Sequence, residues 1–97
     1  MYKRQGLSSS EVWSVLRDHR GFMWFGTLDG LNRYDGYKMK AFKYALTDPT
    51  SLSDNKIRTL YEDRAGTLWI GTWNGGLNRY EPETETFTRF QLSLIHI

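Results

Sequence analysis

The sequence predicts an all-β protein made of two consecutive four-stranded antiparallel sheets. The first observation is an internal repeat: residues 63–72 match residues 18–27 at an offset of 45, and residues 76–80 match residues 30–34 at an offset of 46. The second is that each copy holds four short apolar or β-branched runs, with a long connection only between the copies. No stretch shows sustained helical periodicity. Units of this size and strand number are typical of β-propeller blades, so we predict a β-propeller fragment.

The first copy predicts four strands in order. Residues 11–17 are rich in β-branched and aromatic side chains. The turn that follows combines Asp18, which can bond to the backbone, with Gly21, which tolerates a positive φ. Residues 22–28 are apolar almost throughout, so both faces of this strand should be covered. Asp-Gly turn signals then precede the last two strands, residues 31–34 and 37–44.

The second copy predicts the same four strands after a long polar connection at residues 45–55. Its strands are expected at residues 57–62, 67–73, 77–80 and 86–90. The last hairpin is longer than in the first copy, and hairpin loops tolerate such insertions. The two blades should therefore lie near residues 11–44 and 56–90.

Each copy places a tryptophan two residues before a glycine, Trp24 with Gly26 and Trp69 with Gly71. Residues two apart in a strand share a face, so a large ring lies beside a missing side chain and a neighbouring blade can approach closely. Repeats of this kind bury their apolar faces only by stacking, so the chain alone should be poorly stable. We expect the blades to pack face to face through Trp24, Phe25, Trp69 and Ile70.

Both ends of the chain have the pattern of translated sequencing adapter. Residues 1–5 can be encoded by GTGTATAAGAGACAG, with GTG as a start codon, and residues 92–96 by its reverse complement. Coincidence is the alternative, although the second segment also breaks the repeat. We therefore expect adapter-derived residues at 1–5 and 92–97, a first blade at 6–46, and the inter-blade loop with the second blade at 47–91.

The composition excludes several classes of site. The chain has 13 Lys and Arg against 11 Asp and Glu, and without Lys3 and Arg4 the two counts are equal. A basic excess drives non-specific binding to nucleic acid, so we expect no nucleic-acid contact. No run approaches the ~20 apolar residues of a membrane span. The chain has no cysteine, so a disulfide or a thiolate metal site is impossible.

The pattern Asp-x-x-Gly-x-Leu-Trp-Ile-Gly-Thr, followed by Gly-Leu-Asn-Arg-Tyr, closely resembles the two-component regulator propeller repeat. The second copy carries it at residues 63–72 and 76–80, and the first copy differs at Met23 and Phe25, which keep the apolar character. The resemblance covers residues 7–90. It implies a periplasmic, extracytoplasmic sensor region of a membrane-anchored bacterial protein, in which many blades form one or two rings and a histidine kinase often follows.

The resemblance also implies a function. Many members of this family detect carbohydrate and switch on genes for its use, through a kinase elsewhere in the longer parent protein. The implied partners are an oligosaccharide or other small ligand in the complete propeller, neighbouring blades of the same chain, and a second copy of the parent in a homodimer. A protein-interaction scaffold and a propeller enzyme remain open as alternatives, because propellers host many functions.

Residues that recur at equivalent positions in both copies favour a structural role. Asp18 and Asp63 could be taken for catalytic carboxylates, but they stand at identical turn positions. An arginine that recurs on a blade should pair with a carboxylate or a backbone carbonyl. Outside the expected adapter-derived segments His19 is the only histidine, so a His-based zinc site or triad is not expected. We predict no catalytic residue, metal or cofactor, and therefore no enzyme. The structural set is Asp18, Gly21, Trp24, Gly26, Asp63, Gly66, Trp69 and Gly71.

Residues that differ between the copies are the better candidates for a ligand site. In a propeller, the loops between second and third strands open on the same side as the loops between blades. An aromatic ring at a loop edge can stack on a sugar, and Asn offers both a donor and an acceptor. The alternative is that Trp73 merely caps the core. The loop at 48–55 has side-chain oxygens of the kind that bind calcium, but their spacing does not match the 12-residue EF-hand loop, and turn chemistry explains them. The predicted ligand-binding residues are Trp73, Asn74, Asp29 and Asn55.

Overall fold

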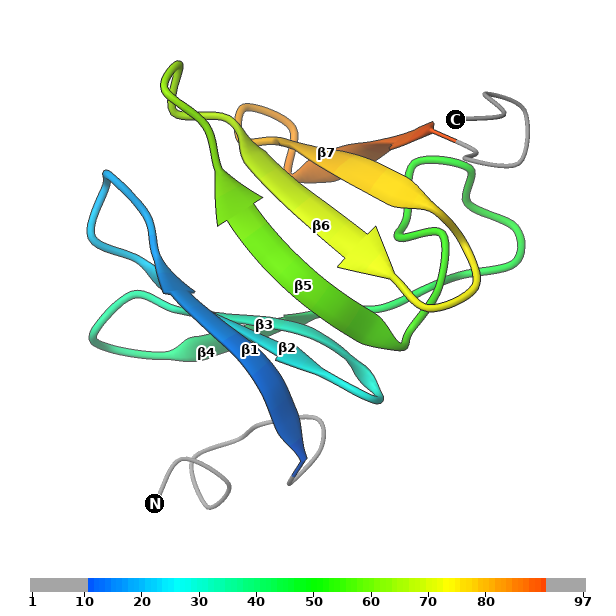
Figure 1. The fold of residues 1–97 in the computed structure, drawn as a ribbon, viewed down its shortest axis with the longest axis horizontal. Coiled ribbons are helices and arrows are strands. Elements are labelled where there is room, and N and C mark those ends of the chain that lie inside the picture. The colour runs from blue at the N-terminus through cyan, green and yellow to red at the C-terminus, as the bar shows by residue number, and fades with distance from the viewer. Residues whose placement is uncertain (1–10, 91–97) are drawn as a thin grey trace.

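The computed structural model describes residues 11–90, which form eight strands and no helix (Figure 1). The expected adapter-derived segments, 1–5 and 92–97, lie outside the described residues. Within residues 11–90 nothing has the length and apolar character of a membrane-spanning helix. The strands are β1 (Val12–Arg17), β2 (Met23–Thr27), β3 (Gly30–Tyr34), β4 (Met39–Phe42), β5 (Ile57–Glu62), β6 (Leu68–Thr72), β7 (Leu77–Glu81) and β8 (Thr86–Phe90).

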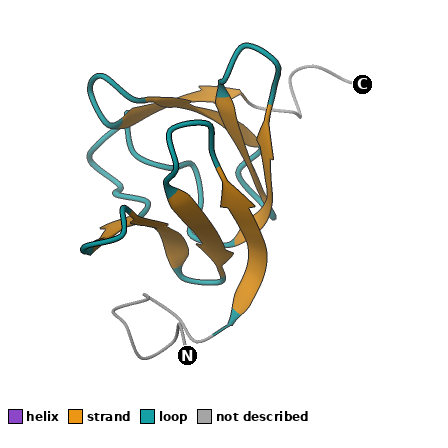
Figure 2. Ribbon diagram, turned by 90° about the vertical axis from the view of Figure 1, so that its left-hand side faces the viewer, coloured by secondary structure: helices purple, strands orange, loops and turns teal. Residues whose placement is uncertain are grey.

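The strands form two four-stranded antiparallel sheets, in the orders β1-β2-β3-β4 and β5-β6-β7-β8. Each is a simple meander, as expected of a propeller blade. The view in Figure 2 shows strands joined only by turns and loops. The prediction of two consecutive blades is confirmed, and every strand end lies within two residues of its predicted place.

A β-bulge interrupts the first strand of each blade. The register of β1 against β2 shifts between Val12 and Ser14, and that of β5 against β6 shifts between Ile57 and Thr59. Trp13 and Arg58 are therefore the extra residues at the two bulges, again 45 residues apart. A bulge re-aims the side chain that it inserts, so these two residues leave the alternation of their strands.

The hydrophobic core lies between the two sheets, where β1 and β5 run side by side (Figure 1). Aromatic rings from both blades interlock in it: the Trp24 and Tyr80 ring centroids are 4.9 Å apart, and those of Phe42 and Phe87 are 5.5 Å apart. The joint between the blades is thus a shared core. Its buried members are Trp24, Leu31, Phe42, Leu52, Ile57, Leu60, Leu68, Ile70, Tyr80 and Phe87.

The prediction that four residues meet at this joint is wrong for two of them. Trp24 and Ile70 are fully buried in the shared core. Phe25 is buried on the opposite face of β2, and Trp69 is half-buried on the outer face of β6, where its ring lies 5.7 Å from that of Phe90. Neighbouring residues of a strand point to opposite faces. Because the blades stack head to tail, each gives only one face to the joint.

Gly26 permits the close approach that the Trp-Gly spacing predicts. A Cβ atom at this position would lie 2.6 Å from Cγ2 of Ile57, on the first strand of the second blade. Cβ atoms are not found at such distances from other carbon atoms, and Ile57 is fully buried. The missing side chain therefore sets how closely the blades approach.

Candidate functional site

Three loops from the two blades meet at one rim, which we call the loop rim. They are the β2–β3 turn, the β6–β7 loop and the inter-blade loop at residues 43–56. The backbone N–H of Gly30 donates to the carbonyl of Asn55 at 2.7 Å, and that of Trp73 donates to the carbonyl of Lys56 at 3.0 Å. The N–H of Asn74 donates to Oδ2 of Asp54 at 3.0 Å. These bonds bring the residues predicted to bind a ligand onto one rim.

The inter-blade loop is held in place by the second blade. Asn78 is fully buried. Its Oδ1 accepts a hydrogen bond from the backbone N–H of Ser53 at 3.1 Å, and its Nδ2 donates to the Ser53 hydroxyl at 2.9 Å. Arg89 donates from Nε to the carbonyl of Ser51 at 3.0 Å. Because the buried Asn78 and the half-buried Arg89 fix the loop, the loop rim is ordered before any ligand arrives, which reduces the entropic cost of binding.

The four predicted ligand-binding residues have different environments on this rim. Trp73 is 44% exposed, and Asn74 is exposed beside it. Asp29 pairs with Nζ of Lys43 at 3.1 Å. Asn55 accepts a bond at Oδ1 from the backbone N–H of Tyr44 at 2.7 Å, which fixes the loop. Trp73 and Asn74 are therefore the two most available to a ligand, and the binding role of all four stays a prediction.

Sequence reasoning missed two residues of this rim, Trp13 and Arg58. The Trp13 and Trp73 rings meet edge to face with centroids 5.6 Å apart, and Cζ of Arg58 lies 5.0 Å from the centroid of Trp73. Regular strand alternation does not place either residue there, because both stand at bulges. The only feature of the sequence that links these two residues is that they stand at equivalent positions of the repeat, 45 residues apart.

The opposite rim, the turn rim, holds the β1–β2, β3–β4, β5–β6 and β7–β8 turns. Asp18 accepts bonds from the backbone N–H groups of Arg20 and Phe22, both at 2.9 Å, and from Nε1 of Trp24 at 2.8 Å. Gly21 completes this turn with a φ of 94°. The carboxylate thus closes the turn and orients the core tryptophan. These bonds already account for both of its oxygens.

Asp63 repeats this arrangement in the second blade. It accepts bonds from the N–H groups of Ala65 at 3.0 Å and Thr67 at 2.9 Å, and from Nε1 of Trp69 at 3.0 Å. Gly66 has a φ of 84°. The bond from Trp69 is the main cause that holds the pKa of Asp63 below its ordinary 3.8, and the bond from Thr67 adds to it.

This shift predicts acid sensitivity. Because the pKa of Asp63 is lowered on folding, its contribution to stability is present above about pH 4 and is lost as pH falls through the folded-state pKa. Thermal unfolding monitored by circular dichroism should show the melting temperature falling in this range. Asp63→Asn should have a shallower dependence on pH there. An unchanged slope in that variant would show that Asp63 does not contribute.

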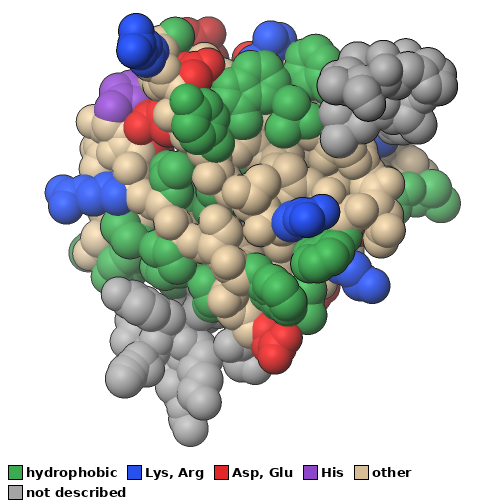
Figure 3. Space-filling model, viewed as in Figure 1, with side chains coloured by type: hydrophobic (Ala, Val, Ile, Leu, Met, Phe, Trp, Pro, Cys, Tyr) green, Lys and Arg blue, Asp and Glu red, His purple; other side chains and the backbone are tan. Residues whose placement is uncertain are grey.

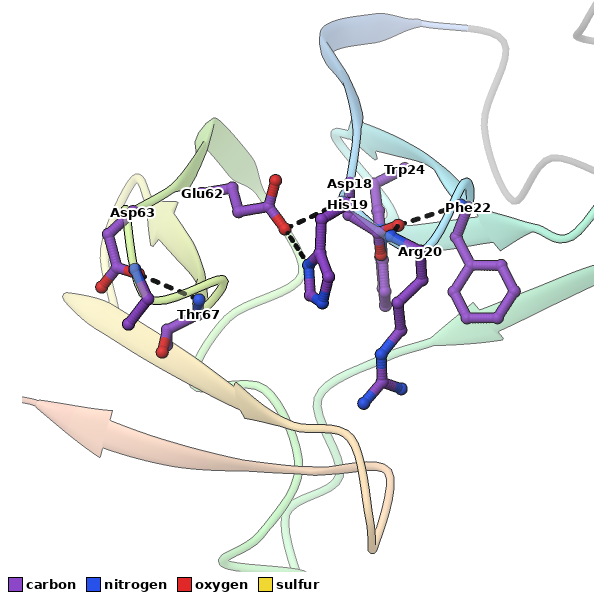
Figure 4. Close-up of polar contacts among 9 residues, drawn as sticks. Asp18, His19, Arg20, Phe22, Trp24, Glu62, Asp63 and Thr67 are labelled. Atoms are coloured by element: carbon purple, nitrogen blue, oxygen red, sulfur yellow. Dashed lines mark hydrogen bonds and ion pairs between the residues drawn. The ribbon is translucent and has the colours of Figure 1, made fainter.

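A groove of about 420 Å³ separates the blades on the turn rim, lined among others by His19, Arg20, Phe22, Glu62 and Tyr80. Figure 4 shows His19 and Glu62 pointing toward each other across it. Nδ1 of His19 lies 2.6 Å from Oε2 of Glu62, and the backbone N–H of His19 donates to the same oxygen at 3.0 Å. In residues 11–90 no three acidic or histidine side chains are grouped to hold a metal ion. The groove therefore contains a cross-link between the blades.

The repeat matches a known protein family. The family profile described as "Two component regulator propeller" matches residues 6–29 and 51–74, one match in each copy of the repeat. The chain belongs to the two-component regulator propeller family. Each matched segment runs from before the first strand of a blade to the loop after its second strand.

This propeller chain is also similar to a named signalling protein. It is 47% identical over 48 residues to Histidine kinase P4 of Formosa agariphila. The match covers 50% of the chain and 4% of the relative. The chain therefore corresponds to a small part of that protein.

Two solved structures share the propeller fold and substantial sequence. One is described as the extracellular domain of a hybrid two component system of B. thetaiotaomicron, with a TM-score of 0.79 and 33% identity over 91% of the chain. A second extracellular domain of such a system from the same organism has a TM-score of 0.68 and 40% identity over 82% of the chain. The chain spans 12% and 11% of these domains.

Proposed function

We propose that the chain is part of an extracytoplasmic, ligand-sensing propeller of a membrane-anchored bacterial two-component signalling protein. In this proposal the propeller senses carbohydrate, and a kinase elsewhere in the longer protein, which acts as a homodimer, passes the signal to transcription. The proposal is supported by the similarity to a histidine kinase and to extracellular domains of hybrid two component systems. The role of these two blades is binding rather than catalysis, without a nucleic-acid contact.

The observation that carries the proposal is the build of the loop rim. Its loops come from both blades and are tied together by backbone bonds, while Trp73 and Asn74 remain open to solvent. Sugar recognition requires an aromatic platform beside hydrogen-bonding groups on a preformed surface. The turn rim differs, because the carboxylates that recur there, Asp18 and Asp63, already accept hydrogen bonds within their own turns.

The proposal predicts a specific loss of affinity. Trp73→Ala in the complete sensor should weaken binding of the inducing oligosaccharide about tenfold, which is ~1.4 kcal/mol, because a partly exposed stacking surface is removed. Isothermal titration calorimetry measures this directly. Tyr37→Ala is the matched control, because Tyr37 is 89% exposed on the turn rim and its loss should leave affinity unchanged.

Two outcomes would contradict the proposal at different levels. Unchanged affinity in a folded Trp73→Ala variant would remove Trp73 from the site. Absence of binding by any oligosaccharide, with the sensor folded, would contradict carbohydrate sensing itself.

A further inference from the structure

The two bulge residues bring a second aromatic ring and a positive charge to the loop rim. Trp13 comes from the first strand of the first blade, while Arg58 and Trp73 come from the second blade. The pair formed by Trp13 and Trp73 therefore spans the joint between the blades. A ligand that contacts both rings would contact both blades at once.

The rings of Trp13 and Trp73 both keep a large solvent-exposed surface. Trp13 is 52% exposed and Trp73 is 44% exposed, although their centroids lie only 5.6 Å apart with planes at 85°. The corresponding residue of the first blade, Leu28, has no ring to offer. Tryptophan pairs of this kind present a large apolar surface with little conformational entropy to lose, which suits the apolar face of a sugar ring.

Arg58 adds charge beside this surface. Its Cζ lies 5.0 Å from the centroid of Trp73, so the guanidinium is held by a cation–π contact. Two other arginines on the blades are neutralised by carboxylates: Arg33 pairs with Glu85 at 3.1 Å and Arg79 with Glu81 at 2.8 Å. In the part of the chain that the structure describes, Arg58 has no such carboxylate partner. Its planar donor fork matches a carboxylate in two parallel bonds.

We propose that Trp13, Trp73 and Arg58 form a subsite for an acidic sugar, a uronate unit of an oligosaccharide. The sugar ring packs on the tryptophans and its carboxylate accepts hydrogen bonds from Arg58. Asn74, exposed beside Trp73, supplies a donor and an acceptor for hydroxyl groups. This subsite rests on the proposed carbohydrate-sensing function and narrows the class of sugar that it takes.

The test separates charge from shape. Tetramers of galacturonate, glucuronate and mannuronate are each titrated into the complete sensor at neutral pH, as the acid, which is then an ionised carboxylate, and as the neutral methyl ester. At least one acid should bind ten times more tightly than its ester. Arg58→Gln should remove this preference while the ester still binds, and Arg58→Lys should retain part of it, because the charge stays but the fork is lost. Trp13→Ala should weaken acid and ester alike.

The matched control is Arg64→Gln, which removes the same charge from an exposed turn on the other rim. It should leave the preference for the acid intact. If acid and ester bind equally, or if the preference survives Arg58→Gln, the acidic subsite is overturned while carbohydrate sensing stands. If no tetramer binds but a neutral oligosaccharide does, the subsite is again overturned. If no oligosaccharide of any kind binds, the proposed function fails as well.

Discussion

Trp24→Ala is expected to destabilise the fold by about 3–5 kcal/mol, the usual cost of truncating a large buried aromatic residue. Trp24 is fully buried between the blades, 4.9 Å from the ring of Tyr80, and its Nε1 is bonded to Asp18. The substitution opens a cavity in the shared core and leaves the Asp18 carboxylate one donor short. Because small domains have only about 5–15 kcal/mol of stability in total, and the chain alone is expected to be poorly stable, the variant should unfold at a much lower urea concentration than the unsubstituted chain.

Trp69→Ala is the matched control, because the two tryptophans occupy the same place in the repeat. Trp69 is only half-buried on the outer face of β6, so its loss should cost about 1–2 kcal/mol. Circular dichroism during urea titration distinguishes the two variants. Equal losses would show that the blades do not share the Trp24 core.

Gly26→Val should cost at least about 3 kcal/mol, more than most overpacking substitutions. The new Cβ would lie 2.6 Å from Cγ2 of Ile57 and 3.2 Å from its Cβ. Ile57 is fully buried and cannot turn aside, so β5 must move away from β2 and the joint must open. The free energy of unfolding from urea titration measures the effect.

The equivalent substitution in the second blade, Gly71→Val, is the control for this prediction. Its Cβ would meet Cγ2 of Thr59 at 2.7 Å, but Thr59 is exposed and a rotation of its side chain relieves the contact. The cost should therefore be clearly smaller. A Gly26→Val variant as stable as Gly71→Val would contradict the role assigned to Gly26.

The strands could be predicted from sequence because the information is local and is given twice. Asp and Gly fix each turn, and the same order of apolar runs and turns recurs 45 residues later. The loop rim could also be predicted, because an up-and-down meander sends alternate loops to opposite ends of the blade. Its candidate residues Trp73 and Asn74 differ between the copies, which is where binding specificity can vary.

The joint and the full rim could not be predicted in the same way. The direction in which the blades stack decides which face of a strand meets the next blade. No sequence pattern close to Phe25 or Trp69 indicates this direction. The sequence did not predict that Trp13 and Arg58 lie on the loop rim, because each stands at a bulge that breaks the two-residue alternation of a regular strand. Asn55 has the residue type of a ligand-binding group, yet its Oδ1 accepts a bond from the backbone of its own loop.

Head-to-tail stacking gives the pair of blades a direction, as in a polymer with unlike ends. At one end Val12 and Val15 are 36% and 53% exposed, while the residues 45 positions later, Ile57 and Leu60, are buried. At the other end hydrophobic side chains reach the surface near β7 (Figure 3). A contact between unlike surfaces either closes into a ring or continues as an open filament. The same joint that builds a propeller therefore makes unclosed blades prone to add to one another end to end.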